Sequence, residues 1–229
     1  MNFLIIFLFD LLLLSFSSAI LMSLLTKNIY KITKSKTITI NLIFAFFLPG
    51  IIIHELSHAL FAGLLFVPMG RISFYPEITK DGIRLGSLEI AQTDFIRRFF
   101  IGISPIIIGL ILILFIIYSL VSNIYLFQSV IPPVIFNLIL IYFLFTICNT
   151  MFSSKKDLEG AGFFLLMIVL LLIFLYFIGI RINYDFLIPF TKYLKSGLLF
   201  LLIPSIINLL IYLVIKIIIR IKSASISRN

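Results

Sequence analysis

Two histidines and a glutamate lie within five residues of a strongly apolar segment, His54-Glu55-Leu56-Ser57-His58. On an α-helix, residues four apart lie on one face one turn apart, so His54 and His58 can bind one metal ion together. Glu55 projects to the side, within reach of a water held by that metal. A zinc ion lowers the pKa of such a water to about 7 and polarises a carbonyl. Glu55 can then carry the proton from the water to a leaving amine.

The composition favours a metal site over a chance occurrence of these residues. The chain has only two histidines, and both belong to this motif. Ionisable residues inside a membrane segment cost about 2.5–3.5 kcal/mol each on insertion scales, so they rarely persist without a partner. A bound metal ion would offset that cost. We therefore interpret His54 and His58 as ligands of one Zn²⁺ and Glu55 as the catalytic residue.

The third ligand has to come from another part of the chain. Asp157 and Glu159 follow a later apolar segment, in the sequence SSKKDLEG. The stretch from Ser154 to Asp157 also has the pattern of a helix N-terminus, where the helix dipole favours an acidic residue in the first turn. From the residues alone, metal ligand and helix cap are equally good interpretations of Asp157.

Membrane helices are the elements expected to position these residues. Of the 229 residues, 62% are hydrophobic and 12% are charged, and the mean hydropathy is +1.26. Too few polar residues remain to cover a soluble domain, so the lipid bilayer is the solvent for much of the surface. Six apolar segments are long enough to cross about 30 Å of hydrocarbon, which takes about 20 helical residues. They cover approximately residues 3–25, 39–66, 100–121, 131–152, 162–180 and 196–219.

The distribution of charge predicts the topology of these segments. The net charge is +9, and the Lys and Arg residues lie in short loops between apolar segments. This pattern is typical of topology signals and of contacts with anionic lipids, and it argues against nucleic acid as a partner. Eleven Lys and Arg fall on one side and seven on the other, so both termini are expected in the cytosol. The first segment lacks a basic leader and carries Asp10, so we expect a retained helix and not a cleaved signal peptide.

The second loop is the one stretch with a β pattern. Apolar residues alternate in RISFYPEIT, and Lys80-Asp81-Gly82 follows. Asp-Gly favours a tight hairpin turn because both turn positions need positive φ. We expect a β-hairpin over residues 71–91 at the membrane surface. Pro76 cannot donate a ladder hydrogen bond, so its arm is expected at an edge, to which an unwound substrate segment could add as a strand.

Together these residues resemble the site-2 protease family of intramembrane zinc metalloproteases. HELSH in a membrane helix is the most specific match. Asn149 precedes Asp157 by eight residues, which is similar to the spacing between the family's Asn and its Asp ligand. GISPIIIG, residues 102–109, resembles the family's motif of small residues and proline in the next core helix. The order of the zinc helix, the β-rich loop and two further core helices also matches, over roughly residues 40–162.

The resemblance implies that Asp157 completes the ligand set of a single Zn²⁺. The residue after Asp157 is leucine where the family has glycine, and SSKK replaces its Pro-rich run, so Glu159 stays open as a less favoured ligand. We predict that Asn149, Gly102 and Pro105 bind the substrate. The alternative for Asn149 is a buried amide bonded to a neighbouring helix, and the alternative for Gly102 is ordinary close packing of helices.

The fold class implied is an all-α polytopic membrane protein with about six transmembrane helices and a small membrane-associated β-hairpin. Within the family the chain most resembles the sporulation-factor-processing branch. The resemblance implies a prokaryotic cell membrane as its location and a transmembrane or signal-peptide-like protein segment as its substrate. Two other functions stay open: a metal transporter or sensor, and an inert homologue that binds membrane helices without cutting them. The predicted single domain, residues 1–229, comprises an N-terminal helix and basic loop (1–38), a protease core (39–161) and two C-terminal helices (162–229).

Overall fold

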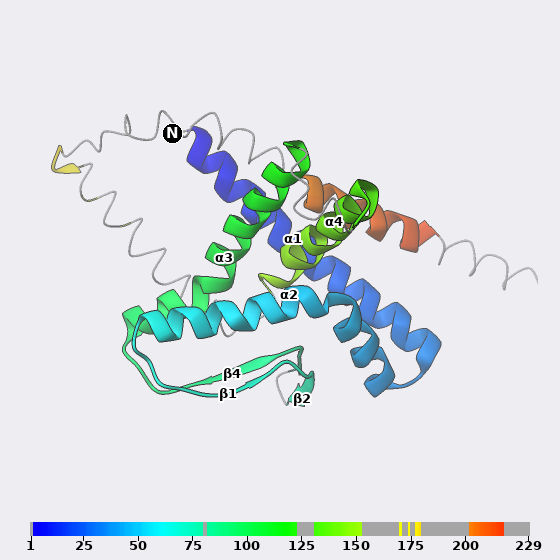
Figure 1. The fold of residues 1–229 in the computed structure, drawn as a ribbon, viewed down its shortest axis with the longest axis horizontal. Helices are drawn as coiled ribbons and strands as arrows, with labels where there is room; N and C mark the ends of the chain where they lie inside the picture. The colour runs from blue at the N-terminus through cyan, green and yellow to red at the C-terminus, as the bar shows by residue number, and fades with distance from the viewer. Residues whose placement is uncertain are drawn as a thin grey trace, which may run out of the picture.

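The computed structural model describes residues 2–79, 82–122, 131–152 and 202–217, with isolated positions between 170 and 179. This part of the chain is mostly helical (Figure 1). The long helices are α1 (Asn2–Thr33), α2 (Lys36–Leu64), α3 (Phe95–Val121) and α4 (Pro133–Thr150). A shorter apolar helix covers Leu202–Ile217. Between α2 and α3 lie four strands: β1 (Met69–Ser73), β2 (Glu77–Thr79), β3 (Gly82–Arg84) and β4 (Ser87–Ile90).

Helices long and apolar enough to cross a membrane account for the first four predicted segments. In the described part of the chain they are Phe9–Thr33, Lys36–Leu64, Phe95–Leu120 and Pro133–Thr150. The prediction of a helical, multi-span membrane protein is confirmed at this level. The helix Leu202–Ile217 coincides with the sixth predicted segment but is described over fewer residues than a full span needs. The fifth segment lies outside the described residues apart from isolated positions, so the count of six stays a prediction.

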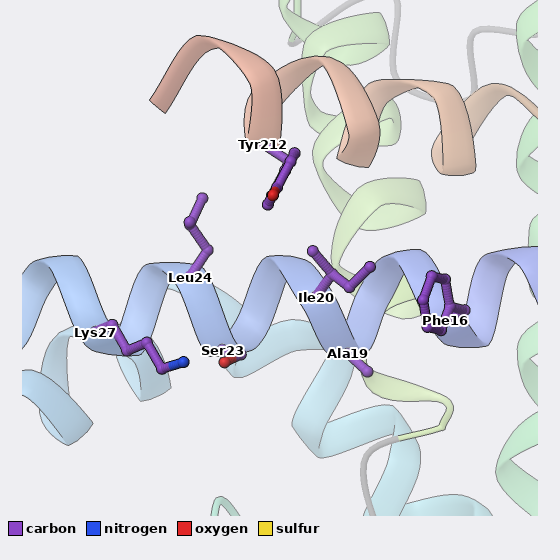
Figure 2. Close-up of a pocket in the computed structure, with 7 residues that line it drawn as sticks. All are labelled: Phe16, Ala19, Ile20, Ser23, Leu24, Lys27 and Tyr212. Carbon is purple, nitrogen blue, oxygen red and sulfur yellow. The ribbon is translucent and has the colours of Figure 1, made fainter. Parts of the chain in front are cut away.

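The helix Leu202–Ile217 runs parallel to α1. Asn208 donates a hydrogen bond to Ser17 Oγ at 3.3 Å. One turn further along this helix, Tyr212 points between Ile20 and Leu24 of α1, with which it lines a pocket (Figure 2). The later residue of this helix therefore meets the later residues of α1, as it does when two helices run in the same direction. Six spans in strict alternation would make the first and last helices antiparallel, so this contact does not favour a cytosolic location for both termini.

A capped turn joins α1 to α2, and one proline bends α2. Lys34 has a φ of 55°, which reverses the chain, and the Ser35 hydroxyl then caps α2 by accepting from the backbone of Ile38 at 3.4 Å. Inside α2, Pro49 has no N–H to donate and disrupts the helical ladder. Figure 1 shows the bend of α2 in this region. Beside it, the Tyr142 hydroxyl of α4 donates to the carbonyl of Phe46 at 2.6 Å, which satisfies one of the acceptors that the bend exposes.

The strands form a hairpin in two antiparallel parts. β1 pairs with β4, with Ser73 opposite Ser87, and β2 pairs with β3, with Ile78 opposite Ile83. The predicted hairpin is confirmed, although its tip at Lys80-Asp81 lies outside the described residues. Pro76 lies in the break between β1 and β2, where no ladder donor is needed. Figure 1 shows β1 and β4 running beneath the second half of α2, so the sheet covers the segment that carries the histidines.

Among the described residues, two of the three apolar clusters join α1 to the other long helices. One joins α1, α3 and α4 through Leu14, Ile113, Ile116, Ile117, Leu144, Ile147, Cys148 and Met151. The other packs Ile43, Phe47 and Ile51 of α2 against α1. Between them, α2 contacts α4 backbone to backbone at Gly50, where an added Cβ would lie 2.5 Å from the carbonyl oxygen of Thr146. This contact fixes the half of α2 that carries the histidines, which begin one turn later.

Candidate metal centre

The two histidines of α2 are buried and lie against each other. His54 and His58 are each 5% exposed, and their Nε2 atoms lie 3.2 Å apart. The rings are nearly perpendicular, at 87°. Two nitrogens bound tetrahedrally to one zinc ion at about 2.0–2.1 Å are separated by about 3.3–3.4 Å. The observed separation therefore fits a shared metal ion with almost no movement of either ring.

A carbonyl of α3 holds the His58 ring from the opposite side. The backbone oxygen of Ile101 lies 2.8 Å from His58 Nδ1. A carbonyl can only accept, so Nδ1 carries the proton and Nε2 keeps its lone pair for a metal. The Ser104 hydroxyl donates to the same oxygen at 2.7 Å and lies 3.4 Å from Nδ1. Metal-binding histidines commonly donate their second N–H to a backbone carbonyl or carboxylate in this way.

The Glu55 side chain lies between α2 and the β-hairpin. It is 6% exposed, and it packs against the backbone of Gly86 in the loop between β3 and β4. A Cβ added at Gly86 would lie 2.7 Å from Glu55 Oε1 and 2.8 Å from its Cγ. Only a residue without a side chain allows this approach. The loop therefore shields the carboxylate, and β4 starts at the next residue, Ser87.

Asn149 of α4 is bonded to the last described helix. Its Nδ2 donates to Asn208 Oδ1 at 3.1 Å, and Asn208 Nδ2 donates back to Asn149 Oδ1 at 2.9 Å. Asn149 also donates to the carbonyl of Phe145 at 2.9 Å. This is the arrangement of a buried amide bonded to a neighbouring helix. Substrate binding by Asn149 stays a prediction, and it would require the amide to exchange Asn208 for the substrate backbone.

The remaining predicted residues fall into two groups. Gly102 is half-buried and Pro105 is buried on α3, in the turn that also carries Ile101. This turn places them near His58, and their contact with substrate stays a prediction. Asp157 and Glu159 lie outside the described residues. Among the residues that are described, no group of three or more His, Cys, Asp or Glu side chains could hold a metal ion. The third ligand therefore stays a prediction.

Sequence reasoning missed two backbone groups of this centre. The Ile101 carbonyl contacts His58, and its signal was a proline four residues later, which removes the carbonyl's helical donor. Gly86 contacts Glu55, and its signal was a glycine within a strand pattern, which often marks close approach of another group. Neither signal identifies its partner, because the partner lies on another element.

Comparison of the chain with protein-family models, with curated proteins and with solved structures gives no significant match. Any assignment of function therefore depends on the motif and on the geometry of the centre.

Proposed function

We propose that this protein is an intramembrane zinc metalloprotease of the site-2 type, which hydrolyses peptide bonds in or near transmembrane segments. The observation that carries the proposal is the His54–His58 pair, with Nε2 atoms 3.2 Å apart on a helix apolar enough to span a membrane. Glu55, the residue after the first histidine, is buried beside that pair. Soluble proteins can bury such a motif in an ordinary core, but a membrane helix retains ionisable groups chiefly for function.

The proposed reaction assigns a separate task to each side chain. A zinc ion held by His54, His58 and Asp157 would supply a water of lowered pKa and polarise the scissile carbonyl. The Glu55 carboxylate takes one proton from the attacking water and passes it to the nitrogen of the leaving amine. The loop at Gly86 limits the access of bulk water to this carboxylate. The peptide bond is thereby replaced by a carboxyl group and an amine, and no redox partner is involved.

The β-hairpin suggests how a helical substrate reaches the centre. A peptide bond in a membrane helix is protected by its own hydrogen bonds, so the substrate has to unwind first. In the described residues β1 and β4 pair only with each other, which leaves one edge of each strand for a further strand. A substrate segment paired along β4 would recover its backbone hydrogen bonds beside Glu55. We propose this edge as the docking position, and a prokaryotic membrane as its setting.

Replacement of Glu55 by glutamine tests the proposal directly. The purified Glu55→Gln protein should contain one zinc per chain, as the parent should. Cells that make it should lack truncated membrane proteins that appear with the parent in comparative membrane proteomics. General acid–base catalysis contributes about 10²–10⁴-fold, so residual cleavage should be below about 1%. The matched control is Glu77→Gln, which changes an exposed carboxylate of β2 in the same way.

Three outcomes would contradict this proposal. Cleavage by Glu55→Gln at the parental rate would remove the catalytic role of Glu55. Zinc uptake into vesicles that contain the protein, without any cleaved product, would instead identify a transporter. An inert binding homologue would show zinc in the parent and no truncated product in either cell line.

A further inference from the structure

Pro105 lies in the interior of α3, where proline is disfavoured. A residue at this position would normally donate its N–H to the carbonyl four residues earlier, and proline has no N–H to donate. The carbonyl left without this donor belongs to Ile101. It is the same oxygen that lies 2.8 Å from His58 Nδ1 and accepts from the Ser104 hydroxyl at 2.7 Å.

We infer that Pro105 is a positioning residue for the metal centre, because it keeps the Ile101 carbonyl available to orient the His58 ring. The inference rests on the proposed function only in taking His58 as a metal ligand. It gives Pro105 a task different from the substrate contact predicted for it. Pro105 touches neither metal nor substrate in this role and acts through a backbone oxygen.

Because the Ile101 carbonyl is buried, it needs a donor from the protein. Ile101 is 3% exposed and Ser104 is fully buried, so water is not at hand to satisfy the oxygen. A buried carbonyl nearly always finds a donor. The donors provided here are the His58 ring and the Ser104 hydroxyl, which converge from two helices. The ring is thereby fixed in the tautomer with the proton on Nδ1, and its Nε2 faces His54 at 3.2 Å.

A simpler role for Pro105 is to bend α3, and the two roles predict different results. A bend alone would affect stability and leave the ring orientation to other contacts. If the Ile101 carbonyl instead orients His58, the affinity for metal depends on the absence of an N–H at position 105. Substitution by alanine restores that N–H, which then competes with His58 for the Ile101 oxygen.

The first test is the zinc affinity of Pro105→Ala in detergent, measured by competition with a chromophoric chelator. Loss of such a supporting hydrogen bond typically weakens metal binding by about 10–100-fold, and we expect a decrease in this range. The spectrum of the Co²⁺-substituted protein should change as well. The control is Pro133→Ala at the first position of α4, where an N–H has no helical partner, and it should bind zinc like the parent. Parental zinc affinity in Pro105→Ala would overturn the inference.

The second test needs no metal and no change at Pro105, and it decides the matter if Pro105→Ala does not fold. Nitrogen-15 NMR of the metal-free parent distinguishes the two neutral tautomers of a histidine ring. The chain has only two histidines, so His58 can be assigned with a single His54→Ala variant. We expect its proton on Nδ1, and a proton on Nε2 with a bare Nδ1 would overturn the inference. This measurement is independent of Glu55→Gln, so failure of the protease proposal and failure of the Pro105 inference are distinguishable.

Discussion

Gly86 is the position where a single methyl group should separate catalysis from metal binding. In Gly86→Ala the new Cβ would lie 2.7 Å from Glu55 Oε1, whereas ordinary contacts begin near 3.4 Å. The loop or the carboxylate must therefore move by about 0.7 Å. A misplacement of about 1 Å can cost about 10²-fold in rate, so we expect cleavage to fall by roughly 10–100-fold. His58 is held by the Ile101 carbonyl of α3 and lies against His54 on α2, and neither contact involves this loop, so zinc binding should persist.

The assay compares the cleavage rate with the zinc content of the same preparations. The matched control is Gly63→Ala near the end of α2, where an added Cβ would meet nothing closer than Met69 Cε at 3.9 Å. That variant should cleave like the parent. Cleavage by Gly86→Ala at the parental rate would show that the Glu55 carboxylate is not held against this loop. Loss of zinc together with activity would show that the loop supports the metal centre as a whole.

Three further predictions concern other parts of the chain. Alanine at Asn149 or Asn208 should each lower the free energy of unfolding by roughly 1–3 kcal/mol, because the remaining amide is left buried without its partner; in a double-mutant cycle the coupling should be about 0.6–1.7 kcal/mol. The carboxylate of Asp94 caps α3 by accepting from the backbone of Arg97 at 3.0 Å, and this hydrogen bond lowers the Asp94 pKa below its ordinary value of 3.8. Its stabilising effect is present above that value and is lost as the pH falls through the lower folded-state pKa, so acid unfolding curves of the parent and Asp94→Ala should converge at low pH. Asp157→Ala should lose zinc in elemental analysis, and unchanged zinc content would point to Glu159.

The positions of the histidines depend on backbone features of α2 that precede them. Pro49 bends the helix, and Gly50 lets the next turn contact α4 where any side chain would collide with Thr146. The segment after the bend then runs over the sheet (Figure 1). A proline and a glycine one turn before His54 thus place both histidines between two core helices and the hairpin.

The sequence by itself determined the features that depend on residues near one another in the chain. Apolar runs of sufficient length predict membrane helices, because lipid requires the backbone to satisfy its own hydrogen bonds. The spacing of His54 and His58 puts both rings on one helical face, because the helical repeat is 3.6 residues. Asp-Gly between alternating residues predicts the hairpin, because the turn geometry is local.

The tertiary structure alone decided which distant groups meet at these elements. The Ile101 carbonyl against His58, the Gly86 backbone against Glu55 and the Asn208 amide against Asn149 each join residues from different elements. Such contacts depend on the angles and offsets at which the elements pack, and these follow from the fit of many side chains at once. The parallel course of α1 and the last described helix belongs to the same class, since alternation along the sequence would have predicted the opposite direction.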